Sequence, residues 1–257
     1  MKSVLVTGAN GQLGQCLRAA AESWDDMVFD FRSQQELDIT NKAAIDNLLE
    51  GNAYDYCINC AAYTNVEAAE KNSEKAFEIN AEAVGIMARS CHEKSVVLIH
   101  ISTDYVFDGE KAGPYLPSDP PNPINEYGKS KLKGEQYVEQ YMSRYFIVRT
   151  SWLYSEYGDN FYIKILEKAH KGETLYITDA QTGTPTNANN LATYILDLIM
   201  TGSKEYGIHH FTDGKPMTWF DFAGQILKDN NLEEGTQLIR NNNYPTFAAR
   251  PKNSVLQ

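Results

Sequence analysis

A tyrosine and a lysine stand four residues apart in the stretch Tyr127-Gly128-Lys129-Ser130-Lys131. On a helix, residues at this spacing share one face, so the Lys131 ammonium can lie beside the Tyr127 hydroxyl. A nearby cation favours the phenolate, and we therefore expect the pKa of Tyr127 to fall from about 10 toward the working pH. Such a tyrosine can exchange a proton with a substrate oxygen.

A glycine-rich loop follows the first apolar strand of the chain. Residues 3–7 read as that strand, Gly8-Ala9-Asn10-Gly11-Gln12-Leu13-Gly14 as the loop, and residues 12–23 as a helix. Gly8 allows the tight turn, Gly11 allows a pyrophosphate to approach the backbone, and Gly14 lets the helix pack closely on the sheet. The spacing is GxxGxxG rather than GxGxxG. In this strand and helix context the loop predicts a site for a dinucleotide cofactor.

Apolar runs and helical patterns alternate along the chain. Strands are expected near residues 3–7, 27–31, 54–59, 96–102, 145–150, 174–177 and 207–211, and helices near 12–23, 41–50, 66–92, 126–142, 159–171, 187–201 and 218–230. Such alternation is typical of βαβ units around a parallel sheet. The sequence therefore predicts an α/β protein with a Rossmann-like, doubly wound parallel sheet.

The charge balance of the chain is acidic. Its 257 residues include 34 Asp+Glu and 23 Lys+Arg, a formal net charge of −11, and we expect no nucleic-acid partner for such a surface. No apolar run reaches the roughly 18 residues of a membrane helix, and no charged and apolar leader precedes the first strand. We therefore expect no membrane association and a cytoplasmic location.

Cys57 and Cys60 form a C-x-x-C pair inside an apolar, strand-like run with no second pair nearby. We expect buried structural thiols here rather than a redox or zinc site. The five histidines show no metal-ligand spacing, and His209-His210 falls in an expected strand, where neighbours point to opposite faces. No metal site is therefore predicted.

Two charged residues at the end of the second strand bear on the identity of the cofactor. Asp30 follows the glycine loop by about 20 residues, where an acid usually accepts from a ribose 2′-hydroxyl and favours NAD. Arg32 can instead meet the 2′-phosphate of NADP, so the choice between NADH and NADPH stays open. Asp38 and Thr40 precede the next helix and can equally cap it.

Two further strand ends carry small or hydroxyl-bearing residues. Residues 59–64 end the third strand, and small side chains there let a cofactor lie against the backbone. Ser102 and Thr103 end the next strand, at the edge of an open α/β sheet where ligands bind. A hydroxyl there can contact both a substrate carbonyl and Tyr127. The long, proline-rich loop 108–123 joins this strand to the tyrosine helix, and such loops are often functional.

Together these motifs resemble the extended short-chain dehydrogenases/reductases and, within them, the dTDP-4-dehydrorhamnose reductase family. The resemblance rests on Gly8-x-x-Gly11-x-x-Gly14, Asn59-x-Ala61-Ala62, residues 102–109, Tyr127-x-x-x-Lys131, and four specific stretches at 61–66, 149–152, 183–186 and 244–254. It implies reduction of the C4 keto group of dTDP-4-dehydro-L-rhamnose to dTDP-L-rhamnose by NADPH or NADH. It also implies a dinucleotide-binding domain at 1–150 and a smaller, interleaved C-terminal substrate-binding lobe at 151–257, with segments that return to the Rossmann domain.

Carried over residue by residue, the resemblance assigns three groups of functional residues. The predicted catalytic residues are Thr103, Tyr127 and Lys131. The predicted cofactor contacts are Gly8, Asn10, Gly11, Gln12, Leu13, Gly14, Asp30, Asp38, Ile39, Ala62, Tyr63, Thr64, Tyr127 and Lys131. The predicted contacts with the nucleotide-sugar substrate are Asp104, Tyr105, Trp152 and Arg250. In the implied mechanism Thr103 polarises the carbonyl, a hydride leaves the nicotinamide, and Tyr127 donates a proton beside Lys131.

The chain departs from the family pattern at three places. Gln15 stands where some members carry a glutamate of a magnesium-linked dimer, so we expect no metal-linked dimer, while a monomer and a homodimer both stay open. Ala249 replaces a second arginine before Arg250, which weakens the expected hold on a diphosphate. The chain also stops at Gln257, short of the usual family length, so we expect either a trimmed version or a missing terminal helix.

Two alternative functions stay open. A related branch of this fold has become a non-catalytic regulatory subunit that binds a partner enzyme; the intact Thr103, Tyr127 and Lys131 argue against it. The other alternative is a reductase or an epimerase that acts on another nucleotide sugar. An assay against a panel of nucleotide-linked 4-keto sugars separates these possibilities.

Overall fold

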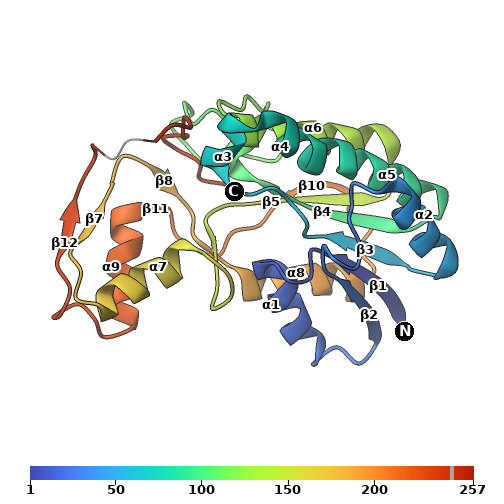
Figure 1. The fold of residues 1–257 in the computed structure, drawn as a ribbon, viewed down its shortest axis with the longest axis horizontal. Coiled ribbons are helices and arrows are strands. Elements are labelled where there is room, and N and C mark those ends of the chain that lie inside the picture. Colours follow the sequence, from blue (N-terminus) through green and yellow to red (C-terminus); the bar gives the residue numbers. More distant parts are fainter. Residues whose placement is uncertain (244–245) are drawn as a thin grey trace.

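The computed structural model describes residues 1–243 and 246–257. Its centre is a six-stranded, fully parallel sheet in the order β10-β5-β4-β3-β1-β2 (Figure 1). The strands are β1 (Lys2–Thr7), β2 (Met27–Arg32), β3 (Tyr56–Asn59), β4 (Val97–Thr103), β5 (Tyr145–Thr150) and β10 (Gly207–His210). The predicted α/β sheet is confirmed, and each of these strands lies within about two residues of its predicted bounds.

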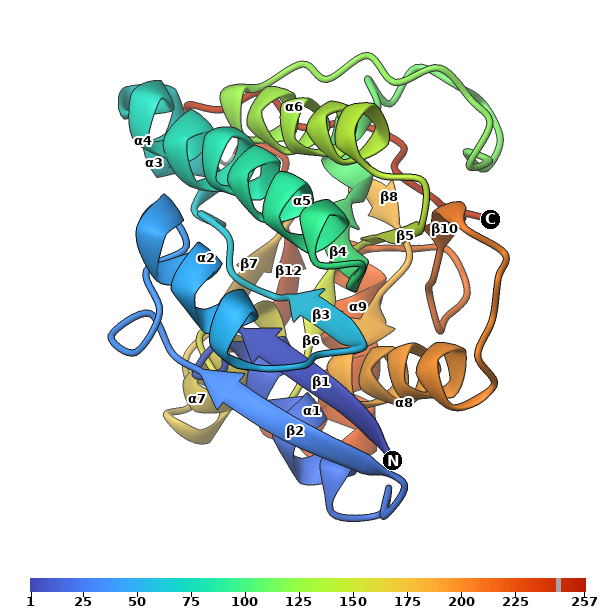
Figure 2. The ribbon, with the colours of Figure 1, turned by 90° about the vertical axis from the view of Figure 1, so that its right-hand side faces the viewer.

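Helices cover both faces of this sheet (Figures 1 and 2). On one face lie α1 (Gln12–Ala21) and α8 (Ala188–Met200), and on the other lie α2 (Lys42–Gly51), α5 (Ala83–Glu93) and α6 (Glu126–Tyr141). Each helix turns an apolar stripe to the sheet, whose central strands are buried on both sides as their continuous apolar runs require. The C-terminal half contributes to this body, because β10 pairs with β5 and α8 packs against α1.

The single helix predicted for 66–92 is wrong in detail, because the structure divides it. The pieces are α3 (Val66–Lys71), α4 (Ser73–Phe77), a π-helical segment (Glu78–Glu82) and α5. Asn72 separates the first two, since its side-chain oxygen accepts the backbone N–H of Lys75 at 3.2 Å and caps α4. The π-helical segment buries Asn80 completely, and such segments are frequent at functional sites.

A second, smaller group of elements lies beside the sheet, on the left of Figure 1. Its helices α7 (Phe161–His170) and α9 (Trp219–Asp229) share an aromatic and aliphatic core. Its two-stranded ladders pair β6 (Leu153–Tyr154) with β9 (Thr186–Asn187), β7 (Leu175–Ile177) with β12 (Leu238–Arg240), and β8 (Thr182–Gly183) with β11 (Met217–Thr218). Only β7 among these matches an expected strand, and all six have at most three residues, too few for a clear alternating pattern.

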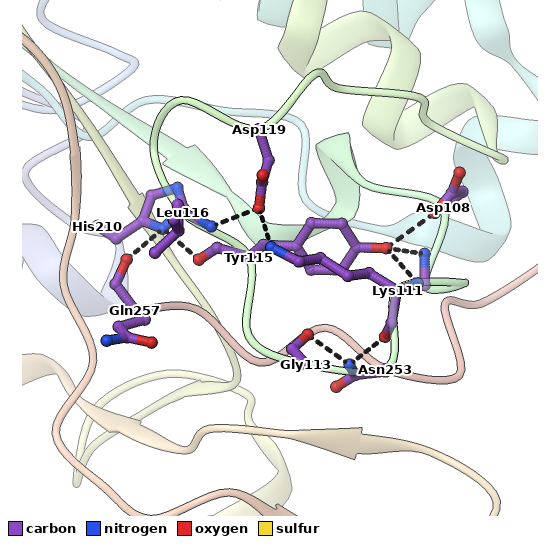
Figure 3. Close-up of polar contacts among 10 residues, drawn as sticks. Asp108, Lys111, Gly113, Tyr115, Leu116, Asp119, His210, Asn253 and Gln257 are labelled. Carbon is purple, nitrogen blue, oxygen red and sulfur yellow. Dashed lines mark hydrogen bonds and ion pairs between the residues drawn. The ribbon is translucent and has the colours of Figure 1, made fainter.

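The long loop 108–123 is tied to the end of the chain (Figure 3). Tyr115 forms a parallel β-bridge with Leu256, and the backbone N–H of Gln257 donates to the Tyr115 carbonyl at 2.9 Å. The Asn253 amide donates to two further carbonyls of the loop at 2.7 and 3.0 Å. The loop therefore takes its shape from contacts with the C-terminal segment.

Candidate active site

Tyr127 lies in the first turn of α6, close to the end of β4. Asn125 caps this helix, since its side-chain oxygen accepts the Gly128 N–H at 2.7 Å. The Tyr127 ring meets the Tyr105 ring edge to face, with 5.8 Å between the centroids. Thr103 ends β4, and its side chain lies near enough to the Tyr127 hydroxyl to lower the pKa of that group. The structure therefore brings together two residues that the sequence presents in separate motifs.

The expected fall in the pKa of Tyr127 is wrong for this structure. Burial raises the pKa of the Tyr127 hydroxyl, the Asp104 carboxyl adds to the increase, and the Thr103 side chain opposes it only in part. Lys131 points elsewhere, because its Nζ donates to the Ile101 carbonyl at 2.7 Å. A protonated hydroxyl is the form that a proton donor needs, so the raised pKa suits a general acid.

Lys131 lies one turn further along α6 and is only 2% exposed. Burial lowers the pKa of its ammonium to about 8, although Glu135 and Cys60 both act in the opposite direction. Its Nζ also lies 3.4 Å from Nε2 of the buried His100. A lysine with a pKa near neutrality can change its charge during a reaction.

The two hydroxyls that end β4 face different surroundings. Ser102 donates to the carboxylate of Glu135, which forms a buried ion pair with Arg149 at 2.7 Å. Thr103 instead donates to Asp104 at 3.0 Å and stays clear of that pair. Thr103 is therefore the hydroxyl of the two that is placed to meet a substrate carbonyl.

Asp104 is a buried carboxyl beside this hydroxyl. Burial raises the pKa of Asp104 to about 7, and hydrogen bonds to the carboxylate oppose the increase only in part. Oδ1 accepts from Thr103, and the Ser254 side chain also acts on the carboxylate, whereas the buried Oδ2 has no hydrogen bond of ordinary length and angle among residues 1–243 and 246–257. A buried oxygen without a partner is unusual, and a ligand hydroxyl would satisfy it.

A cavity of about 320 Å³ lies at the glycine loop. Its lining consists of Gly8, Asn10, Gly11, Gln34, Gln35, Leu37, Asp38, Ile39, Thr40, Cys60, Ala61, Ala62, Lys75 and Ile79. A Cβ on Gly8, whose φ is +67°, would lie 2.6 Å from the Ala61 backbone nitrogen, so the loop needs glycine there. Gly11 precedes α1, and within the described structure no side chain caps this helix. Its N-terminal N–H groups therefore suit an anion, and the site fits a dinucleotide.

Six predicted cofactor contacts line this cavity, namely Gly8, Asn10, Gly11, Asp38, Ile39 and Ala62. Leu13 and Gly14 are buried in α1 instead. Gln12 reaches toward the second group of elements, where the Asn160 amide donates to its Oε1 at 2.7 Å. Tyr63 is fixed by Asn80, which accepts its N–H at 2.8 Å and donates to its carbonyl at 2.9 Å. Thr64 is exposed just before α3.

Asp30 and Arg32, the two charged residues at the end of β2, form an ion pair. Arg32 Nε lies 2.7 Å from Asp30 Oδ1, and the Tyr54 hydroxyl donates to the same carboxylate. The cavity lining continues through Gln34 and Gln35 rather than through this pair. Each of the two charges is therefore compensated by the other in this structure.

The predicted substrate contacts occupy two further positions. Trp152 stacks on Trp219, with centroids 3.5 Å and planes 5° apart, and its φ of +48° is strained for a non-glycine residue. Arg250 forms an ion pair with Glu67 at 2.9 Å and donates to the Tyr105 hydroxyl at 3.3 Å. The first two residues of the motif 244–254 lie outside the described residues.

Sequence reasoning does not identify four residues that support this site. Asn80 joins the segment after β3 to α6, because its amide donates to the Ser130 hydroxyl at 3.0 Å. Glu135 lies four residues after Lys131 on α6, and that spacing is a signal that identifies it. Glu67 and Trp219 carry no such signal, because their partners lie far away in the sequence.

Comparison with known proteins identifies the family. A family model described as RmlD substrate binding domain matches residues 1–257. The chain belongs to this family. Among its relatives, the dTDP-4-dehydrorhamnose reductase of Aggregatibacter actinomycetemcomitans is 35% identical, over 100% of this chain and 90% of the relative. The dTDP-4-keto-6-deoxy-D-glucose reductase of Streptomyces niveus is 36% identical, over 98% of this chain and 87% of the relative.

A solved structure is similar to this RmlD-family chain along its whole length. The dTDP-4-dehydrorhamnose reductase of Bacillus anthracis, in complex with NADP, is 37% identical and superposes with a TM-score of 0.93 over 100% of this chain and 91% of the relative. In the part of the chain that the structure describes, no helix has the length and apolar character to cross a membrane. In that part, no group of three or more His, Cys, Asp or Glu side chains is arranged to hold a metal ion.

Proposed function

We propose that this chain reduces the C4 keto group of dTDP-4-dehydro-L-rhamnose to give dTDP-L-rhamnose. The observation that carries the proposal is the juxtaposition of Thr103 and Tyr127 at the end of β4, with Lys131 buried one turn further along α6. The full-length similarity to reductases of this name supports it. We place the reaction in the cytoplasm and assign it to a monomer or a homodimer.

The glycine loop and the cavity beside it would hold NADPH or NADH. Asp38, Ile39 and Ala62 line this cavity, and the N–H groups at the start of α1 suit the pyrophosphate. The relative from Bacillus anthracis is in complex with NADP, which supports NADPH as a cofactor here. When bound, the cofactor supplies the hydride.

Tyr127 acts as the general acid in this proposal. When substrate binds, the Thr103 hydroxyl turns its proton from Asp104 to the C4 oxygen. Tyr127 transfers its own proton to that oxygen as negative charge develops there. The raised pKa of Tyr127 keeps the hydroxyl protonated before the reaction. Lys131 lies one helical turn away, and its charge acts on Tyr127 whenever the lysine is protonated.

Residues 151–257 contribute a substrate-binding lobe in this proposal, together with Asp104 and Tyr105. Asp104 Oδ2 is available to a sugar hydroxyl. Arg250 supplies positive charge for the diphosphate within a chain of net charge −11, although it shares this charge with Glu67. Trp152 offers an aromatic surface to the sugar or the base.

A substrate panel tests the proposal. Oxidation of NADPH and of NADH is followed with dTDP-4-dehydro-L-rhamnose, dTDP-4-keto-6-deoxy-D-glucose and a UDP-linked 4-keto sugar. We expect the highest kcat/KM with the first substrate. Highest activity with the second would instead assign the chain the activity for which its Streptomyces niveus relative is named. No turnover with any of the three would refute the reductase assignment.

Replacement of Tyr127 by phenylalanine tests the mechanism. Tyr127→Phe is expected to lower kcat by about 10²–10⁴-fold, because it removes only the donated proton, while the Kd for the cofactor stays unchanged. Tyr137→Phe is the matched control, since Tyr137 lies on the same helix and donates to Glu82 at 3.0 Å on the exposed side. Retention of more than about a tenth of kcat in Tyr127→Phe would exclude Tyr127 as the acid.

A further inference from the structure

A row of polar side chains crosses the sheet beneath the site. The strand registers pair Thr7 of β1 with Asn59 of β3, and Asn59 with His100 of β4. Thr7 Oγ1 lies 2.8 Å from Asn59 Oδ1, and Asn59 Nδ2 lies 3.2 Å from His100 Nδ1. His100 Nε2 lies 3.4 Å from Lys131 Nζ. The row therefore ends at the lysine of the proposed site, and each of its members is at most 2% exposed.

The orientation of the Asn59 amide is fixed by a backbone group. The Ala61 N–H donates to Asn59 Oδ1 at 3.2 Å, and the Thr7 hydroxyl donates to the same oxygen. A backbone N–H cannot accept a hydrogen bond, so a flipped amide would set its NH₂ group against the Ala61 N–H. Asn59 therefore presents its NH₂ group to His100.

The proton of His100 is assigned by this neighbour. Because Asn59 Nδ2 donates, His100 Nδ1 accepts, and the single proton of the neutral imidazole lies on Nε2. A second proton on Nδ1 would face the amide protons of Asn59. Burial, together with the Lys131 charge, lowers the pKa of His100 well below its usual range, in agreement with a neutral ring. The Nε2–H group therefore points at Lys131.

A proton on Nε2 distinguishes the two forms of Lys131. The neutral amine has a lone pair that accepts from the His100 Nε2–H, whereas the ammonium has three donors and no acceptor. The amine keeps its other contact as well, because it still donates to the Ile101 carbonyl. His100 therefore favours the form of the lysine that has lost its proton.

The other titratable neighbours of Lys131 act in the opposite direction or carry no charge. Glu135, four residues further along α6, and Cys60, directly after β3, both raise the pKa of Lys131. Glu135 shares its charge with Arg149 of β5, and Tyr127 is a protonated hydroxyl one turn earlier on α6. Among the residues that the structure describes, His100 is the remaining titratable side chain within hydrogen-bonding range of the Lys131 Nζ, at 3.4 Å, and its ring is neutral.

We propose that His100 is a positioning residue that holds the Lys131 side chain through Nε2–H and favours its neutral amine. The inference rests on the proposed function in one respect, namely that Lys131 acts at the cofactor and the reacting tyrosine. A lysine held in this way is not confined to the charged form, because its neutral amine also has a partner.

Two substitutions separate the halves of the imidazole. His100→Gln places an amide N–H near the position of Nε2 and so keeps a donor toward Lys131. His100→Asn keeps an acceptor near the position of Nδ1, which serves Asn59, but loses the donor toward Lys131. Asn59→Ala leaves His100 intact but frees its tautomer, so that Nε2 can accept from the ammonium.

The measurement is the Kd for NADPH across the neutral and alkaline range, by fluorescence or calorimetry. Affinity for the anionic cofactor is expected to fall as Lys131 loses its charge. The plot of log Kd against pH then changes slope at the pKa of Lys131, and Lys131→Met should abolish this break. His100→Asn and Asn59→Ala are expected to move this break upward by about one pH unit, the scale of one hydrogen bond, because the neutral amine loses its partner. His100→Gln is expected to leave the break where the wild type has it.

Two results would overturn the inference. One is a wild-type profile that has no break, or whose break persists in Lys131→Met. The other is a shift of the break that is equal in His100→Asn and His100→Gln. The readout is cofactor binding and not sugar reduction. A chain with the expected breaks but no turnover of any sugar would therefore refute the proposed function and leave the role of His100 standing.

Discussion

Gly128 and the Tyr105 carbonyl approach so closely that a Cβ on Gly128 would lie 2.2 Å from the carbonyl oxygen. Gly128 follows Tyr127 in the first turn of α6, and Tyr105 lies two residues after Thr103 at the end of β4. The contact between the two backbones therefore determines how close the hydroxyls of Tyr127 and Thr103 can come. Glycine is needed here for close approach, and not for an unusual φ.

Gly128→Ala is expected to separate the start of α6 from the end of β4. A displacement of about 1 Å can lower kcat by about 10²-fold, and the overpacking costs about 1–3 kcal/mol of unfolding free energy. Gly113→Ala in the long loop is the matched control, because a Cβ there meets no atom within 4 Å. Steady-state kinetics and urea unfolding measure both effects. Wild-type kcat in Gly128→Ala would mean that this contact does not position Tyr127.

The sheet can be predicted from the sequence because buried parallel strands give continuous apolar runs. The strands of the second group other than β7 cannot, since ladders of two or three residues are set by tertiary packing and not by a local pattern. The division of the helix predicted for 66–92 has a similar cause. Asn80 turns inward to reach the Tyr63 backbone and Ser130, contacts that no local periodicity reports.

The sequence predicts which residues of the candidate site share an element, but not their pKa values or their contacts with other elements. The spacing of Tyr127 and Lys131 predicts that both belong to one helix face, and the structure bears this out. The spacing does not predict the pKa of Tyr127, because burial and the carboxyl of Asp104 decide it. It also does not predict that the Lys131 ammonium turns to the Ile101 carbonyl, since β4 is brought beneath α6 only by the fold.

The Asp104 carboxyl gives the stability of the fold a dependence on pH. Its pKa is about 3.9 in an unfolded chain and about 7 in the folded one. The stabilising contribution of the proton is therefore fully present below about pH 3.9 and is lost as the pH rises through about 7. Asp104→Asn removes this dependence, so the variant should gain stability relative to the wild type between about pH 5 and pH 8, by on the order of 1–4 kcal/mol.

Urea unfolding of both proteins at the two pH values measures this effect. Asn keeps a side-chain oxygen for the Thr103 hydroxyl, so the substitution removes the titration and retains the contact. A stability difference between Asp104→Asn and the wild type that does not change with pH would contradict the raised pKa.

The ion pair of Asp30 and Arg32 makes the choice of cofactor depend on both residues. Arg32→Ala frees the Asp30 carboxylate to repel a 2′-phosphate, so preference should move toward NADH. Asp30→Ala frees the guanidinium, so preference should move toward NADPH. Each change should be worth about 1–3 kcal/mol, the scale of one charge-assisted hydrogen bond. The double variant should shift the cofactor preference less than either single variant does, because the paired charges are removed together.

The measurement is kcat/KM with NADPH and with NADH for the wild type and the three variants. Tyr54→Phe is a useful control, because it removes the neutral hydrogen bond to Asp30 and leaves the ion pair intact. Ratios that stay the same in both single variants would mean that the adenosine ribose does not lie against the end of β2.

The contact between Gly183 and Trp152 allows a test of the substrate site that does not involve the cofactor. A Cβ on Gly183 would lie 2.4 Å from Cε2 of the Trp152 indole, and the indole also stacks on Trp219 at 3.5 Å. The ring has little room to move away, so Gly183→Ala should displace it. If Trp152 contacts the nucleotide sugar, KM for the sugar should rise by about tenfold, roughly 1.4 kcal/mol, with the Kd for NADPH unchanged. Gly224→Ala in α9 is the control, since the nearest atom to its Cβ is 3.7 Å away and alanine favours the helix. If a folded Gly183→Ala variant keeps the wild-type KM, the substrate does not contact the displaced indole, and Trp152 does not belong to the substrate site.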